Sequence, residues 1–106
     1  MKVFISQPMR DKTNEQIEKE RGDAISYVRN KLGAKKVEII DSFFKDAPHE
    51  AKPLWFLGKS FELLSTADVA VFIGDWANYR GCNMEYKACQ EYGIKAVDLN
   101  LTHGEE

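Results

Sequence analysis

The chain has 106 residues, the length of one ordinary domain, so we expect a single core over residues 1–106 and no separate substrate domain. Fifteen Lys and Arg against seventeen Asp and Glu leave a net charge of −2, which argues against a binder of nucleic acid polymers. Cys82 and Cys89 do not make a disulfide framework, and no cluster of four Cys and His ligands suggests structural zinc. We expect no metal and no cofactor.

The first residues carry too few consecutive apolar side chains for a signal peptide. No stretch approaches the roughly 18 apolar residues that span a bilayer. We therefore expect a soluble, cytoplasmic protein without a membrane partner.

Residues 2–6 are a β-branched and aromatic run that predicts a first strand, ended by Pro8. Thr13 and Gln16 have the spacing of a capping box, which predicts the start of a helix, and Gly33 predicts a left-handed residue at its end. The apolar face expected for this helix consists of Ile17, Ala24, Ile25, Val28 and Leu32.

Residues 36–41 predict a second strand, followed by a loop over residues 42–52. Pro53 suits the first turn of a second helix. Its expected apolar stripe consists of Leu54, Leu57, Phe61 and Leu64. Residues 67–73 form the most apolar run, as a central strand covered on both faces requires.

A loop over residues 75–80 precedes a third helix, expected from about Cys82 to Tyr92 and closed by Gly93. Residues 95–99 predict a last strand, and the tail from about residue 102 has little to bury. Strands that alternate with helices predict an α/β fold of three layers, with a parallel sheet of about four strands and helices on both faces.

Ligands of such folds bind beyond the carboxyl ends of the strands, where the loops begin at Ser6, Asp41, Gly74 and Asp98. The loop after the central strand is long, and it carries aromatic, acidic, amide and guanidinium groups: Asp75, Trp76, Asn78, Tyr79 and Arg80. These groups suit a flat ring with a polar rim. The alternative is an exposed turn without a ligand.

Glu85 shares a helical face with Ala88, Cys89 and Tyr92, so we expect it to point toward the sheet from the first turn of its helix. The positive end of the helix dipole favours an ionised carboxylate there, which suits a buried nucleophile. The alternative is that this acid merely complements the dipole. Cys82 and Cys89 are expected to be small buried side chains, and His49 and His103 to be surface residues.

The loop Ser6, Gln7, Pro8, Met9 and Arg10 leads to the start of the first helix, with Lys12 and Thr13 beyond it. Backbone N–H groups and a guanidinium at a helix start suit a phosphate. The loop lacks the glycine spacing of known phosphate-binding motifs, so a solvated charged turn is the alternative.

Three segments, KVFISQPMR, ELLSTADVAVFIGDW and RGCNMEYKACQEYGIKAV, together resemble the nucleoside 2-deoxyribosyltransferase-like superfamily. The similarity is greater with its small, often phage-borne branch than with the characterised enzymes. The resemblance implies a flavodoxin-like fold, Glu85 as catalytic nucleophile and assembly into homodimers or higher oligomers. It also aligns residues 6–10 with the contacts to the sugar and its 5′ side.

Two positions depart from the family. Phe4 stands where characterised members have a tyrosine that orients the glutamate, and Ser60 stands where they have an aspartate near the leaving base. Asp75 and Tyr79 are then the candidates for the proton donor. The predicted catalytic residues are Glu85 and Asp75, and the predicted substrate-binding residues are Ser6, Gln7, Pro8, Met9, Arg10, Asp41, Ser60, Trp76, Tyr79, Arg80, Gly81 and Asn83.

Two functions are favoured, and a structural or protein-interaction role is the remaining alternative. One is cleavage of the N-glycosidic bond of a nucleoside or nucleotide, or deoxyribosyl transfer, through Glu85. The other is non-catalytic binding of a nucleotide or a nucleotide-derived signal in the same pocket. Phe43, Phe44, Trp55 and Phe56 are expected to contribute in part to a contact with a second subunit.

Overall fold

The structure, a computed structural model, describes residues 1–44 and 47–100, and its centre is a four-stranded sheet. The strands are β1 (Lys2–Ser6), β2 (Glu38–Ile39), β3 (Val69–Phe72) and β4 (Lys95–Asp98). They lie in the order β2-β1-β3-β4, and all three pairings are parallel. This order is that of flavodoxin-like doubly wound folds, so the predicted fold class is confirmed.

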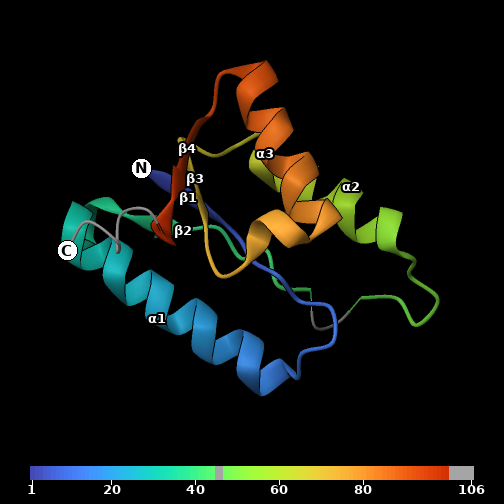
Figure 1. Ribbon diagram of the computed structural model, residues 1–106. Helices are drawn as coiled ribbons and strands as arrows, with labels where there is room; N and C mark the ends of the chain where they lie inside the picture. The colour runs from blue at the N-terminus through green and yellow to red at the C-terminus, as the bar shows by residue number, and fades with distance from the viewer. Residues whose placement is uncertain (45–46, 101–106) are drawn as a thin grey trace.

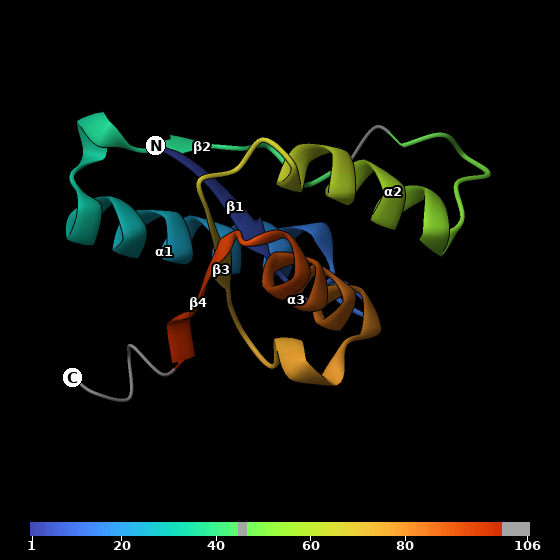
Figure 2. The same ribbon diagram turned by 90° about the horizontal axis from the view of Figure 1, so that it is seen from above.

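Helices cover both faces of the sheet, as Figures 1 and 2 show. One face carries α1 (Asn14–Leu32), and the other carries α2 (Pro53–Leu64) and α3 (Arg80–Tyr92). Side chains of β1 and β3 alternate between the two layers, because successive residues of a strand point to opposite faces. Val3, Ile5, Val69 and Val71 pack toward α1, whereas Phe4, Ala70 and Phe72 pack toward α2 and α3.

The local start and stop signals act where the sequence predicts them. Thr13 Oγ1 accepts from Gln16 N at 3.1 Å, and Gln16 Oε1 accepts from Thr13 N at 2.9 Å, so the capping box is confirmed. Gly93 ends α3 in the left-handed conformation, with φ 71° and ψ 27°. Gly33 also has a positive φ of 89°, but its ψ of 119° is not left-handed helical, so that expectation was wrong.

Several element boundaries differ from the prediction, and β3 and β4 are each shorter than the predicted strands 67–73 and 95–99. The second strand covers only Glu38–Ile39, because residues 34–36 form a 3₁₀ helix and this strand pairs on one side only. The loop after β3 contains a 3₁₀ turn over Trp76–Asn78. As a result α3 begins at Arg80, earlier than expected, and Glu85 lies in its second turn rather than its first.

Several expected apolar stripes are wrong in part. The exposed members are Leu32, Leu54, Phe61 and Tyr92, with Leu54 exposed by 76% and Tyr92 by 82%. Conversely, α1 buries Arg21, whose Nη2 donates to Ile40 O at 2.8 Å and to Ser42 Oγ at 3.1 Å. Burial lowers the pKa of this guanidinium, and the negative charge of Asp41 opposes that shift.

None of the helices in residues 1–44 and 47–100 is both long and apolar enough to cross a membrane. Cys82 and Cys89 are buried free thiols, as expected, and His49 is exposed. The expected loose tail and His103 lie outside the described residues.

Candidate functional site

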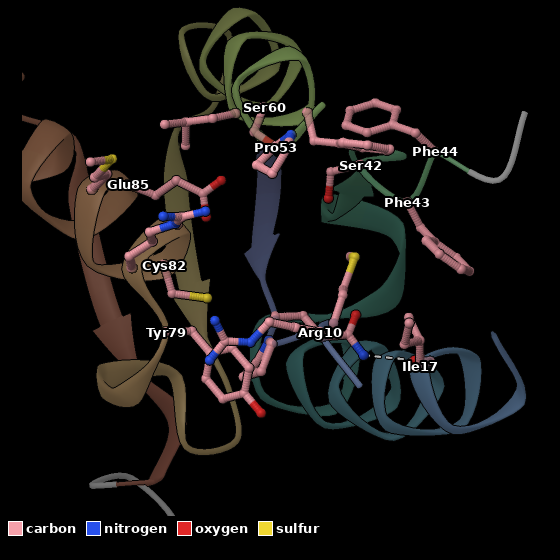
Figure 3. Close-up of a pocket in the computed structure, with 18 of the residues that line it drawn as sticks. Arg10, Ile17, Ser42, Phe43, Phe44, Pro53, Ser60, Tyr79, Cys82 and Glu85 are labelled. Carbon is pink, nitrogen blue, oxygen red and sulfur yellow. Dashed lines mark hydrogen bonds between the residues drawn. The ribbon is translucent and has the colours of Figure 1, made fainter. Parts of the chain in front are cut away.

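A cleft of about 1030 Å³ opens beside the carboxyl ends of β1 and β2, at the sheet edge where doubly wound folds bind ligands. Its walls come from four segments: residues 4–17, residues 42–44, residues 52–60 at the start of α2, and residues 79–85. Figure 3 shows Glu85 and Cys82 on one side and Ser42, Phe43 and Phe44 on the other. The volume lies at the upper end of the range typical for small-molecule sites.

Glu85 is the buried acid of this cleft, with 7% of its surface exposed. It points toward the sheet because Cys82 and Cys89, on the same helical face, pack inward with it. Its Oε1 accepts a hydrogen bond from Ser6 Oγ at 2.7 Å. Burial raises the pKa of Glu85, and hydrogen bonds from the Ser6 and Ser60 hydroxyls lower it in part.

Burial disfavours the thiolate form of both cysteines. Burial raises the pKa of Cys82 to about 11, although a hydrogen bond with Ser6 opposes the shift. Burial and the nearby Glu85 charge also raise the pKa of Cys89. Among the described residues that line the cleft, Glu85 is therefore the group suited to act as an anionic nucleophile.

Cations surround the cleft mouth. Its described lining contains four of them, Arg10, Lys12, Lys52 and Arg80, against the single carboxylic acid Glu85. Arg10 is exposed and lies over the Tyr79 ring, 5.5 Å from its centroid (Figure 3). Lys12 is held by Glu20, Nζ to Oε2 2.9 Å, so its charge is already paired. Arg10 has a longer and solvent-exposed ion pair, Nε to Asp11 Oδ2 4.0 Å, which water screens. The arrangement therefore favours an anionic ligand near Arg10.

Most of the predicted site residues come together in the structure. The cleft is lined by Gln7, Pro8, Met9, Arg10, Ser60, Tyr79, Arg80, Gly81 and Glu85. Ser6 lies fully buried behind the cleft surface, bonded to Glu85. Gln7 is fixed by its amide, whose Nε2 donates to Ile17 O at 2.7 Å.

Four predicted site residues do not reach the cleft: Asp41, Asp75, Trp76 and Asn83. The 3₁₀ turn directs Trp76 inward, where its ring stacks on Tyr86 with centroids 4.9 Å apart. Asn83 Nδ2 donates to Ala77 O at 2.7 Å and to Tyr79 O at 2.9 Å, so it holds the loop to α3. Asp41 and Asp75 are exposed.

The cleft also has an apolar wall that sequence reasoning did not assign to the site. Phe43, Phe44, Phe56 and Leu57 line it, and Phe44 packs against the Phe56 ring at 6.5 Å. The sequence feature that could have indicated this wall is the position of Phe43 and Phe44 directly after the second strand. All strands of a parallel sheet have their carboxyl ends at the same edge, where ligands bind.

No group of three or more His, Cys, Asp or Glu side chains within the described ranges is placed to hold a metal ion. Comparison with protein-family models gives no match, and neither the curated proteins nor the solved structures contain a significant match to the chain.

Proposed function

We propose that the protein breaks the N-glycosidic bond of a nucleoside or nucleotide, by hydrolysis or by deoxyribosyl transfer, with Glu85 as nucleophile. The observation that carries the proposal is a buried carboxylic acid, hydrogen-bonded by Ser6, in a cleft at the carboxyl edge of the sheet. A buried acid is costly for the fold, and such groups concentrate at functional sites. The resemblance to the nucleoside 2-deoxyribosyltransferase-like superfamily supports the same role.

The proposed reaction balances as a double displacement. A carboxylate oxygen of Glu85 bonds to C1′ while the C1′–N bond breaks through an oxocarbenium-like transition state, and the bonding pair leaves with the base. Water or a second base then displaces Glu85 from C1′. The departing base needs a proton. Of the two candidate donors, Asp75 and Tyr79, only Tyr79 lines the cleft, so its hydroxyl is the proposed donor.

The test is to mix purified protein with deoxynucleosides and their 5′-monophosphates and to follow free base by chromatography. Release of base from at least one substrate is expected, and Glu85→Ala should stop it. If no base appears, or if Glu85→Ala keeps the full rate, the proposal is wrong.

Non-catalytic nucleotide binding is the second candidate, and one observation favours it. Asp75 is outside the cleft, and Glu85 is the one acid in its described lining, so no second carboxyl group is placed to protonate a leaving base. Calorimetry with the same panel separates the candidates. Tight binding with every ligand recovered intact supports a binding protein, whereas absence of binding contradicts both.

We expect Arg10 to favour a 5′-phosphorylated ligand over the plain nucleoside. A charge-assisted contact is worth about 1.5–3 kcal/mol, and the exposure of Arg10 places it at the low end, so the preference should be about tenfold. Arg10→Ala should remove it in calorimetric titrations. Lys12→Ala is the matched control and should have a smaller effect, because Glu20 already pairs with Lys12. Equal binding of both ligands to the unaltered protein would contradict this prediction.

We also expect the protein to form a homodimer or higher oligomer through α2. This 12-residue helix carries many apolar side chains, yet Leu64 is its one buried residue. Leu54 and Phe61 lie seven residues apart on one face of α2, and both are exposed apolar side chains of the kind that marks an interface. Light scattering at tens of micromolar should give at least twice the chain mass, and Leu54→Glu should shift it toward the monomer. A strictly monomeric mass for the unaltered protein excludes the oligomer.

A further inference from the structure

The face of β1 that looks toward α2 and α3 carries Phe4 and Ser6. Phe4 is 1% exposed in this layer, and its side chain offers Glu85 no hydrogen-bond donor. Ser6 lies two residues further along the same strand, so its side chain points to the same face of the sheet, about 6.6 Å nearer the carboxyl edge. A hydroxyl therefore reaches Glu85 from the end of β1.

We propose that Ser6 is the positioning residue of Glu85: its hydroxyl holds the carboxylate by the 2.7 Å hydrogen bond to Oε1 and thereby fixes its orientation. The catalytic part of this inference rests on the proposed function of Glu85. The hydrogen bond between Ser6 and Glu85 does not depend on that function.

The Ser6 hydroxyl is firmly placed. Ser6 pairs with Phe72 in the β1–β3 register, and its carbonyl accepts from Ile73 N at 3.1 Å. The side chain is 1% exposed, so water does not compete for the hydroxyl. A distance of 2.7 Å lies at the limit between an ordinary hydroxyl bond and one to a charged carboxylate.

The Ser6 hydroxyl has one proton, and it donates this proton in the hydrogen bond to Glu85 Oε1. Its interaction with Cys82 lowers the pKa of that thiol, but burial has the larger and opposite effect. Around Glu85, β1 contributes Ser6, α2 contributes Ser60, and α3 contributes the thiols of Cys82 and Cys89. Burial thus raises the Glu85 pKa, and the two hydroxyl donors lower it.

The discriminating pair of variants is Ser6→Thr and Ser6→Val, which have the same shape but differ in the hydroxyl. The readout is the Glu85 pKa, followed through the side-chain carboxyl carbon by NMR titration. Loss of a hydrogen bond to a charged group should raise this pKa by about one to two units in Ser6→Val. Ser6→Thr should stay close to the unaltered protein.

Ser42→Ala is the matched control. Ser42 is also buried at this sheet edge, and its Oγ donates to Ile5 O at 3.3 Å rather than to Glu85. The Glu85 pKa should not move in this variant. An equal Glu85 pKa in Ser6→Thr and Ser6→Val would overturn the inference.

Kinetics provide the second readout. For any substrate that releases base, Ser6→Val should lower kcat about tenfold or more with little change in KM, and the acidic limb of the pH profile should move up with the NMR pKa. A kcat unchanged in Ser6→Val would also overturn the positioning role. If the pKa moves as expected but no variant and no unaltered protein releases base, the hold of Ser6 on Glu85 stands and the glycosidic function fails.

Discussion

Replacing Glu85 with glutamine is expected to lower the rate of base release by about 10³-fold or more. The amide keeps the shape of the side chain but removes the anionic oxygen that must bond to C1′, and loss of a covalent nucleophile is among the largest effects in enzyme kinetics. Ligand affinity should change far less, because the cationic groups of the cleft mouth remain. Single-turnover chromatography and calorimetry on the same Glu85→Gln sample separate the two quantities.

The same substitution should leave stability at neutral pH unchanged or higher. Burial raises the pKa of Glu85 in the folded protein, so the folded chain holds this proton more tightly than the unfolded chain. The resulting stabilisation is fully present below the unfolded pKa, and it is lost as pH rises through the raised folded pKa. Above the raised folded pKa the ionised carboxylate therefore opposes folding, and Glu85→Gln relieves that cost.

Thermal unfolding at two pH values tests this sign. Near pH 7 the Tm of Glu85→Gln should equal or exceed that of the unaltered protein, and the advantage should vanish near the unperturbed glutamate pKa of about 4.3. A clear loss of Tm at neutral pH would mean that Glu85 has a structural role. Activity should show the opposite dependence, because the rate falls as pH drops through the raised Glu85 pKa and the nucleophile takes up a proton.

The fold was predictable because its signals are local. The strand in residues 2–6, the capping box and the Gly93 stop each depend on a few neighbouring residues, and the structure has all three. Alternation of strands and helices then leaves few topologies open. The start of α3 was not predictable in this way, because it depends on a 3₁₀ turn and on Asn83 bonding to backbone carbonyls of that turn.

The site was predictable only where one helix or one loop determines it. The inward direction of Glu85 follows from its spacing to Cys82 and Cys89 along α3. Its contact with Ser6 joins positions 79 residues apart, and that contact depends on how β1, β3 and α3 pack. Trp76 shows the converse error: an aromatic in a loop suggested stacking on a ligand, whereas burial against Phe72 and Tyr86 satisfies the ring within the fold.

The second large effect is expected from Phe72→Ala, which should lower the free energy of unfolding by about 3–5 kcal/mol. Phe72 is fully buried on β3, and its ring centroid lies 5.0 Å from that of Trp76 and 5.3 Å from that of Tyr86. Removing the ring leaves a cavity between the sheet and α3. The expected decrease is a large share of the whole free energy of unfolding of a domain, which is about 5–15 kcal/mol. Urea denaturation followed by circular dichroism measures it.

Phe61→Ala is the control for this prediction, since Phe61 on α2 is 39% exposed and its loss should cost about 1 kcal/mol or less. Tyr86 follows Glu85 directly on α3, so relaxation of α3 into the Phe72 cavity should also displace the carboxylate from Ser6. A Phe72→Ala protein that is still folded should then show a raised Glu85 pKa, whereas the Phe61→Ala protein should not. A decrease in the free energy of unfolding below about 2 kcal/mol for Phe72→Ala would contradict the prediction that the Phe72 ring holds α3 against β3.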